Sequence, residues 1–444
     1  MTQSREGLLP RESTRSQDKN KTKIYAIAFC IITLFALSKI FKITALSYLG
    51  AAVAFFGSVL FKTDESFLLL FALLPNTFFS TVQGNAICGY LAMLYCARVL
   101  FNNRRIPRKL LVTLFAFIMA CALSFVHNQS TAVLFQNVKI FFYFLSFALF
   151  FLSTDGSAVI EDFIHLFSFG NAVGVVWGLV YYLVRGISLF SIQARFCGLS
   201  ADPNYFSTIN TFSFTALLTL GWIRHKYQKY EIAEMAFLLV CSCLSLSRGF
   251  ILSMAVILVA YFFLSKKRTI RISRVIATVF ITGVLIVIFR DSITAFIKSI
   301  VTRNKNDIDL GNGRVEIWIE YLKITFSSVL NALLGAGDAG YFRTLYDLEG
   351  IEHNTVIQIL LNAGICGLIV YGYCIRNIQK MLYSVRAAKE SVTAFIFPML
   401  LSCTVPYLFL SGYGNENFTF CILLSCMMPL FADEERKNHV FENR

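Results

Sequence analysis

The segment IEHNTVIQILLNAGICGLIV, residues 351–370, joins a polar cluster to a long apolar run. Glu352, His353 and Asn354 stand directly before the apolar residues, which continue to about residue 375. A helix needs roughly 20 apolar residues to cross the hydrocarbon core of a bilayer, and this run is long enough. The segment therefore predicts a transmembrane helix that begins at a membrane surface with ionisable and hydrogen-bonding side chains.

Similar apolar runs recur along nearly the whole chain. Of its 444 residues, 57% are hydrophobic and 15% are charged, whereas soluble domains carry roughly 25% charged residues. The alternating segments of a β-barrel are absent. We therefore expect an all-α, polytopic integral membrane protein with about 12–14 transmembrane helices. The apolar runs lie near residues 24–41, 43–61, 66–82, 85–101, 110–126, 132–152, 163–184, 205–223, 231–246, 249–264, 274–290, 354–375, 393–411 and 415–431.

The distribution of positive charge predicts the orientation in the membrane. The formal net charge is +14, which by itself would suit a polyanionic partner. With a cytoplasmic N-terminus, however, 27 of the 40 Lys and Arg residues fall on the cytoplasmic side, as the positive-inside rule requires. The basicity therefore needs no nucleic acid as a partner, and we expect both termini in the cytoplasm.

This segmentation divides the chain into five regions, of which the third is a long outer loop. Long loops on one face of a rigid scaffold are where functional residues usually collect. A shorter outer connection runs from about residue 185 to residue 204. The five regions are a disordered basic cytoplasmic tail at 1–23, transmembrane helices 1–11 at 24–290, the long loop at 291–352, transmembrane helices 12–14 at 353–431, and a cytoplasmic tail at 432–444.

The long loop contains a helical pattern of its own. Apolar residues recur at helical spacing between Arg314 and residue 334, with Trp318 among them and charged residues on the other face. Gly335 suits the end of this helix, because glycine is common just past a helix C-terminus. We therefore expect an amphipathic helix at 314–334 that lies on the outer surface of the membrane.

Three cationic or titratable residues fall on the predicted outer side. Arg248 lies in the turn before the tenth span, Arg314 opens the amphipathic helix, and His353 precedes the twelfth span. Each has an ordinary explanation. Arg248 could reach lipid head groups, Arg314 could be a surface charge, and Asn354 could cap the helix with His353 as a solvated neighbour. Their occurrence on one face of the membrane favours a shared site.

Such a cluster suits a lipid-linked diphosphate as substrate. Cleavage of the sugar C1–O bond leaves negative charge on the diphosphate, which either a divalent metal or guanidinium groups can stabilise. The outer loop offers the short acidic pattern Asp307–Asp309, but nucleotide sugars, which such patterns serve, are not supplied on that face. We therefore expect arginine rather than metal, and no cofactor. A neutral histidine could accept a proton from an acceptor hydroxyl.

The motifs around these residues resemble those of a known family. HNTVIQILLNAGICGL (353–368) is similar to the signature of the O-antigen polymerase and ligase superfamily, the Wzy- and WaaL-type membrane glycosyltransferases. SRG (247–249) resembles the shorter arginine motif of that family, and GRVEIWIEYLKI (313–324) with LLGAGDAGYF (333–342) resembles its Gly-Arg-x3-Trp helix and Gly-x-Gly turn. The resemblance covers residues 247–371 and leaves the N-terminal half unmatched.

This resemblance implies a GT-C-like fold, a metal-independent glycosyltransferase activity and roles for individual residues. Arg248 and Arg314 would hold the diphosphate of an undecaprenyl-linked glycan, and His353 would activate the acceptor hydroxyl. Further substrate-binding candidates are Asn354, Trp318, Arg195, Asp202 and Asn204. An Asp-Pro turn is the simpler explanation for the last three of these.

Three functions stay open. A polymerase would join lipid-linked oligosaccharide repeat units at the periplasmic face, and a ligase would transfer the finished chain to lipid A-core or to a protein. We favour the polymerase, because sequence divergence is common there and no acceptor domain follows the last span. A transporter or flippase is disfavoured, because we find no acidic residue in the middle of a span and only Lys139 among the basic residues.

The resemblance also implies partners and a location. The partners would be the undecaprenyl-diphosphate-linked donor and acceptor, membrane lipids, and flippase and chain-length regulator proteins. We expect a multi-pass protein of the bacterial inner membrane.

Overall fold

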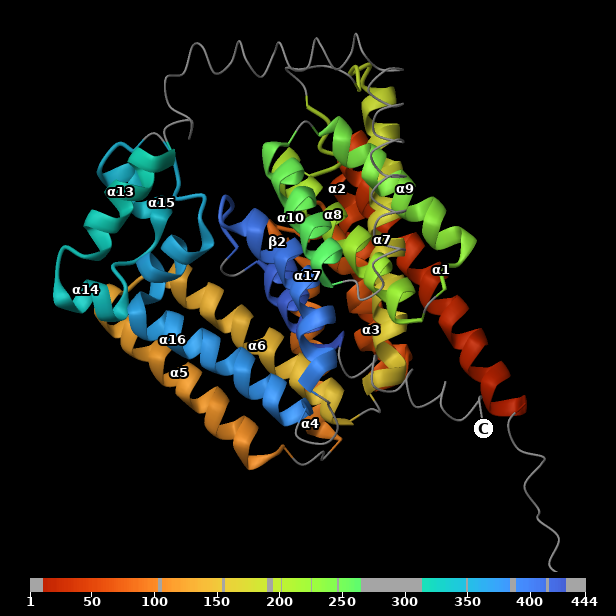
Figure 1. The fold of residues 1–444 in the computed structure, drawn as a ribbon, viewed down its shortest axis with the longest axis horizontal. Coiled ribbons are helices and arrows are strands. Elements are labelled where there is room, and N and C mark those ends of the chain that lie inside the picture. The colour runs from red at the N-terminus through yellow and green to blue at the C-terminus, as the bar shows by residue number, and fades with distance from the viewer. Residues whose placement is uncertain are drawn as a thin grey trace, which may run out of the picture.

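The computed structural model is almost entirely helical (Figure 1). It describes residues 11–102, 106–153, 156–189, 195–200, 202–224, 226–245, 247–264, 314–348, 350–383, 389–412 and 415–428. The elements are α1 (Arg11–Phe41), α2 (Thr44–Leu60), α3 (Thr63–Leu73), η1 (Leu74–Asn76), β1 (Thr81–Val82), β2 (Asn85–Ala86), α4 (Ile87–Phe101), α5 (Arg108–Asn128), α6 (Thr131–Ser153), α7 (Gly156–Val184), α8 (Pro203–Ile223), α9 (Lys229–Leu244), α10 (Arg248–Leu264), α13 (Arg314–Thr325), α14 (Val329–Leu334), α15 (Ala339–Leu345), α16 (Thr355–Tyr383), α17 (Lys389–Tyr407) and a last helix at Glu416–Met428.

Five helices within the described residues are long and apolar enough to cross a membrane. They lie at Asn20–Phe41, Arg108–Asn128, Thr131–Leu152, Val159–Val184 and Thr355–Met381. Shorter apolar helices accompany them, among them Thr44–Leu60 and Glu416–Met428. The predicted class, an all-α polytopic membrane protein, is therefore confirmed.

One expected span is wrong. The apolar run near residues 66–82 predicts a continuous helix, but α3 ends at Leu73 and a short 3-10 turn and a hairpin follow. Pro75 explains the end of α3, because a proline inside a helix removes a backbone donor and clashes with the preceding turn. In the hairpin, Thr81 pairs with Ala86 and Val82 with Asn85.

Two further expected segments differ in their bounds or cannot be compared. Helix α1 begins at Arg11, within residues 1–23, for which the sequence predicts a disordered tail. The expected span at 274–290 lies outside the described residues.

The amphipathic helix expected at 314–334 is two helices, α13 and α14. The chain turns between them because Ser328 adopts an extended conformation and its side chain accepts a hydrogen bond from the backbone N–H of Asn331. Serine is a preferred N-cap, so this residue starts a new helix where apolar periodicity alone predicts continuity. The predicted end is confirmed, since α14 ends at Leu334 and Gly335 follows with a φ of 88°.

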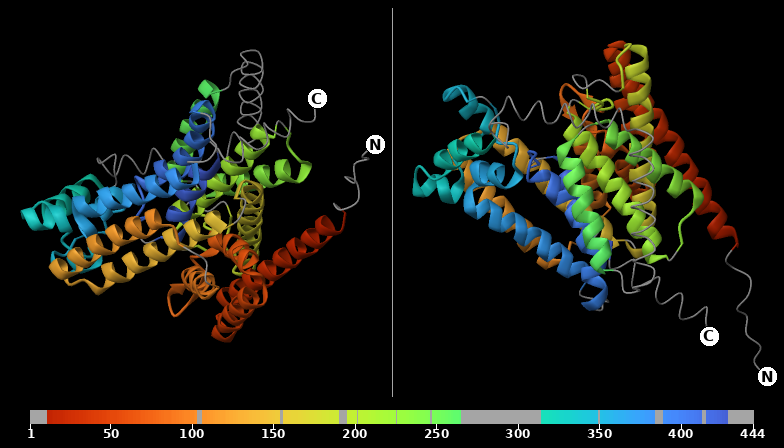
Figure 2. Two further views of the ribbon diagram at one scale, coloured as in Figure 1. Left: turned by 90° about the horizontal axis from the view of Figure 1, so that it is seen from below. Right: turned by 45° about the horizontal axis from the view of Figure 1, so that its top comes forward.

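Helices α13, α14 and α15 form a separate layer over one end of α5 and α16. Figure 1 shows this layer beside the paired helices α5, α6 and α16, and both views of Figure 2 place it on the side of the molecule remote from α1. His127 at the end of α5 is within 2.8 Å of the Asn331 side-chain oxygen on α14. The layer is therefore attached to the ends of two long helices.

An interruption in α16 provides the main attachment point. Gly364 has φ 66° and ψ −169°, values outside the helical region, so the backbone bonds around it are broken. The carbonyl of Leu361 instead accepts the backbone N–H of Gly337 at 3.0 Å. The carbonyl of Asn362 accepts the Ser124 hydroxyl at 3.0 Å and the Asn128 amide at 3.3 Å. The interruption in α16 thus supplies hydrogen-bond acceptors to α5 and to the loop layer.

Gly364 cannot be replaced without moving the loop layer. A Cβ at this position would overlap the backbone of Leu333 and Leu334, and its positive φ disfavours any other residue. We expect Gly364→Ala to lower the free energy of unfolding by at least about 1–3 kcal/mol, measured as a lower Tm of the detergent-purified protein and lower abundance in membranes. Gly372 lies on the same helix, and nothing lies within 4 Å of the place that an added Cβ would take. Gly372→Ala is therefore the matched control and should have no such effect.

Candidate functional site

The chain just after α17 is the centre of a network of hydrogen bonds. In this 408–411 segment α17 has ended, so the backbone carbonyls are free to accept hydrogen bonds from side chains of other elements. Side chains from α8, α13 and the start of α16 donate to these carbonyls. The bonds are Asn354 Nδ2 to Leu408 O (2.9 Å), Arg314 Nη1 to Phe409 O (3.1 Å), Thr355 Oγ1 to Leu410 O (2.7 Å) and Tyr205 OH to Ser411 O (2.5 Å).

Helix α13 holds two of the predicted residues against this network. Arg314 is its first residue and reaches the Phe409 carbonyl. Trp318 lies one turn later, and its indole N–H donates to the backbone carbonyl of Glu352 at 2.6 Å. The Trp318 ring also lies 6.2 Å from the Phe409 ring. The geometry therefore gives Trp318 a role in joining α13 to the loop before α16.

Glu352 lies at the junction of these contacts, although the sequence did not single it out as a site residue. It is only 1% exposed, and its Oε1 atom accepts the Ser411 hydroxyl at 2.9 Å. Burial disfavours the charged carboxylate and raises the pKa of Glu352 above its ordinary value, although its hydrogen bonds oppose this shift. Within the described residues, its second oxygen, Oε2, has no hydrogen-bond partner.

His353 is partly buried and adopts an unusual backbone conformation. Its φ is 39°, which is rare for a residue other than glycine and is common at functional sites. Burial lowers the pKa of His353, and the positive charges of Arg314 and Arg343 lower it further, while Asp202 opposes them. The imidazole is therefore neutral at pH 7. Among the described residues, none is a hydrogen-bond partner for its Nδ1 atom.

Asn354 caps α16 and also binds the 408–411 segment. Its Oδ1 accepts the backbone N–H groups of Val356 at 2.9 Å and Ile357 at 3.1 Å, while its Nδ2 holds the Leu408 carbonyl. Capping was one of the two explanations that the sequence offered for this residue. The structure adds that this one side chain fixes both the start of α16 and the position of the 408–411 segment.

A second group of contacts joins the outer connection before α8 to the turn before α10. Arg195 donates to the carbonyl of Ser245 at 2.9 Å and to the side-chain oxygen of Asn204 at 3.2 Å. The same Asn204 oxygen accepts the Ser247 hydroxyl at 2.9 Å. Asp202 caps α8, accepting the backbone N–H of Asn204 at 2.6 Å, with Pro203 as the first helical residue. The Asp-Pro turn is thus present.

The two groups of contacts are neighbours. Tyr205 follows Asn204 on α8 and bonds the Ser411 carbonyl, and the charge of Asp202 acts on the pKa of His353. Arg248 is the first residue of α10, directly after Ser247; its side chain lies outside what the structure describes. The structure therefore brings together Arg195, Asp202, Asn204, Arg314, Trp318, His353 and Asn354.

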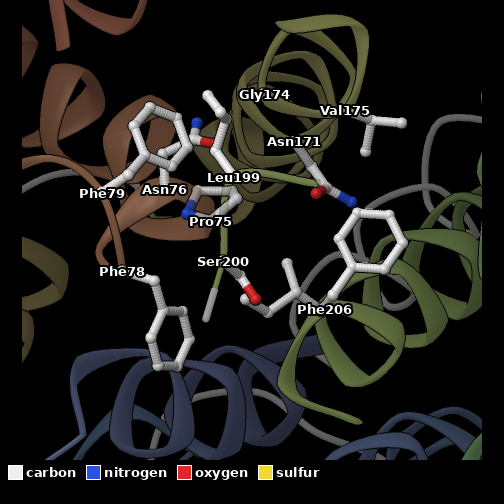
Figure 3. Close-up of a pocket in the computed structure, with 11 residues that line it drawn as sticks. Pro75, Asn76, Phe78, Phe79, Asn171, Gly174, Val175, Leu199, Ser200 and Phe206 are labelled. Atoms are coloured by element: carbon white, nitrogen blue, oxygen red, sulfur yellow. The ribbon is translucent and has the colours of Figure 1, made fainter. Parts of the chain in front are cut away.

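A small pocket lies behind this site, between η1, α7 and α8 (Figure 3). Its walls are mainly apolar, and its free space has room for about one water molecule. Asn76 and Asn171, which Figure 3 shows on opposite sides, already donate to Gly170 and to α8. Phe78 in its wall packs against Tyr205 with ring centroids 4.9 Å apart. The pocket therefore supports the packing of α8 and is too small for a sugar.

Metal binding was considered for Asp307–Asp309, but these residues lie outside the described ranges. In the described ranges, no group of three or more His, Cys, Asp or Glu side chains is arranged to hold a metal ion.

The fold and the site define a polytopic helical membrane protein with a cationic and histidine-containing site where a loop layer meets the start of a long span. A family model described as O-antigen ligase (Wzy_C) matches residues 235–372, which include Arg314 and His353. This match covers only part of the chain, and it supports the resemblance of that part to the O-antigen polymerase and ligase superfamily. No curated protein matches the chain.

The two functions of the Asn354 side chain can be separated by substitution. Asn354→Ala removes the cap and the bond to Leu408, and we expect it to lower the free energy of unfolding by about 1–2 kcal/mol. Asn354→Ser keeps a capping oxygen but loses the amide donor. We expect the serine variant to recover most of the Tm of the detergent-purified protein. A Tm for the alanine variant equal to that of the wild type would contradict the capping role.

Proposed function

We propose that this site transfers a glycan from an undecaprenyl-diphosphate-linked donor to the hydroxyl of an acceptor, and that the protein is a polymerase of surface-polysaccharide repeat units. The observation that carries this proposal is the convergence of Arg314 and the His353 loop on the 408–411 segment. A fixed guanidinium beside a neutral imidazole combines an anion-binding group with a hydrogen-bonding group for a hydroxyl.

Arg314, together with Arg248, would bind the diphosphate and stabilise the negative charge that develops as the C1–O bond breaks. The bond from Arg314 to the Phe409 carbonyl supports this role, because it fixes the position of the guanidinium before substrate arrives. Pre-organised charge acts without a cost of reorientation during the reaction. The transfer would then need no metal ion.

His353 would act on the acceptor hydroxyl. Burial and the nearby arginines keep it neutral, which leaves one ring nitrogen as a donor and the other as an acceptor. A protonated imidazole would add a further positive charge next to Arg314 and could not accept a hydrogen bond. The lowered pKa of His353 therefore favours the state in which it can activate a hydroxyl.

A lipid-linked substrate suits the surface of the loop layer. Exposed apolar residues follow one another along α13, α14 and the turn between them, among them Val315, Ile319, Phe326, Val329 and Leu330, and Val329 is 75% exposed. Such a face on an amphipathic element favours the membrane interface. We propose that it faces the periplasmic leaflet of the inner membrane, with both termini in the cytoplasm and with flippase and chain-length regulator proteins as partners.

A ligase is the second candidate, and the match to the O-antigen ligase family model favours it. The same residues would hold the donor in either enzyme, and only the acceptor differs. Deletion of the gene from its host distinguishes the two. Lipid-linked glycans with a single repeat unit indicate a polymerase, and full-length polymer retained on the lipid carrier indicates a ligase. Surface glycans unchanged in amount and length would contradict both.

Substitution of the two central residues tests the site directly. We expect Arg314→Ala to lower the rate of glycan transfer by roughly 100–1,000-fold and His353→Ala by roughly 100–10,000-fold, with membrane abundance unchanged. The measurement is restoration of surface glycans in the deletion strain. Lys323→Ala is the control on the same helix, because Lys323 forms only an exposed ion pair with Glu320 and should be dispensable. Loss of the Arg314 and His353 variants from the membrane would instead indicate a structural role.

A further inference from the structure

Two polar atoms on consecutive residues lack hydrogen-bond partners among the residues that the structure describes, Glu352 Oε2 and His353 Nδ1. The other polar atoms around them are used. Glu352 Oε1 accepts from Ser411, and the Glu352 carbonyl accepts from Trp318. Both groups of the Asn354 amide are also bonded. The two unpaired atoms therefore lie next to groups of Glu352 and Asn354 that are already hydrogen-bonded.

Leaving a polar atom buried without a partner costs free energy, and in native proteins such atoms usually mark a binding or catalytic function. The two atoms have complementary requirements. A carboxylate oxygen only accepts, whereas a neutral imidazole nitrogen can donate. A hydroxyl group meets both, since it donates one hydrogen and accepts another. The chemical class that meets both requirements is thus an alcohol, such as a sugar hydroxyl.

We propose that the acceptor hydroxyl binds between Glu352 and His353 and transfers its proton to Glu352 Oε2. This proposal rests on the proposed glycan transfer. The acceptor oxygen forms a bond to C1 of the donor sugar, and the C1–O bond to the diphosphate breaks with its electron pair on the diphosphate. The proton of the acceptor moves to the carboxylate, and His353 holds the acceptor oxygen in line.

Electrostatics favours Glu352 over His353 as the group that receives the proton. A protonated His353 would carry a positive charge beside Arg314 and Arg343, which is why those residues lower its pKa. Glu352, in contrast, loses a buried charge when it is protonated, and burial raises its pKa. The surroundings thus favour protonation of Glu352 and disfavour protonation of His353.

Other ionisable groups face Glu352 from the elements packed around it. Asp338, which caps α15, adds a negative charge that raises the pKa of Glu352 further. The hydroxyls of Tyr205 on α8 and Tyr321 on α13 also feel the charge of Glu352. The tyrosine hydroxyls are uncharged at neutral pH, so of these three groups only Asp338 favours the protonated form of Glu352. The Ser411 hydroxyl opposes Asp338, because its hydrogen bond to Oε1 stabilises the carboxylate.

Glu352→Gln tests the proton acceptor with little change in shape. The glutamine oxygen can still accept the Ser411 hydroxyl, but the side chain cannot take up a proton. We expect the kcat of glycan transfer to fall by roughly 100-fold or more, with the KM for the lipid-linked donor and the membrane abundance close to those of the wild type. The assay uses the full-length protein in proteoliposomes with a lipid-linked oligosaccharide as donor.

Ser411→Ala provides a second measurement that a merely structural role would not affect. Wild-type activity requires the carboxylate, so it should fall as the pH decreases through the raised pKa of Glu352. Removing the Ser411 hydroxyl removes a contact that lowers this pKa. The acidic limb of the pH–activity profile should therefore move to higher pH in Ser411→Ala.

The outcomes separate this proposal from the function on which it rests. Wild-type activity of Glu352→Gln, with Arg314→Ala and His353→Ala inactive, would overturn the role of Glu352 and leave glycan transfer intact. Full activity of all three variants would overturn the proposed site itself. If Glu352→Gln does not accumulate in the membrane, an acidic limb that stays in place in Ser411→Ala overturns the proposal, and a shifted limb supports it.

Discussion

The site depends on one constraint, which is that α17 ends at Tyr407 in the interior of the protein rather than in water. Four successive residues after it expose carbonyls that no helix N–H satisfies. Backbone carbonyls outside regular secondary structure still need donors, and here the donors come from α8, α13 and the start of α16. Segments that are far apart in the sequence are thereby held to one short piece of backbone. The positions of Arg314 and the His353 loop follow from this requirement.

The helix that follows the 408–411 segment is also fixed to the rest of the protein at its first residue. Glu416 begins the last helix and accepts the Tyr143 hydroxyl of α6 at 2.7 Å, with Lys139 at 3.9 Å. The sequence suggested that Lys139 is isolated in its span, but the structure places Glu416 next to it. Lys139 is partly exposed and its ion pair is long, so the pair adds little net stability. The pair is better understood as fixing the position of the last helix, and with it the 408–411 segment.

Local rules explain what could be predicted from the sequence. Asn354 before α16, the Asp202-Pro203 pair before α8 and Gly335 after α14 are short-range signals whose physics is contained in a few neighbouring residues, and each helix boundary is found there. The 408–411 segment could not be found in this way, because its functional atoms are backbone carbonyls that every residue carries. Glu352 was similarly hidden, since only the fold shows that its carboxylate is buried against Ser411.

Two features near His353 would be disadvantages in a purely structural loop. A positive φ at a histidine is strained, and the buried polar atoms of Glu352 and His353 that lack partners among the described residues lower stability further. The surrounding network of bonds to the 408–411 segment compensates for this cost and holds the two side chains in place. A scaffold that commits so many contacts to an unfavourable loop conformation is typical of a site that is pre-organised for a ligand, because natural sequences deviate from local rules mainly where function requires it.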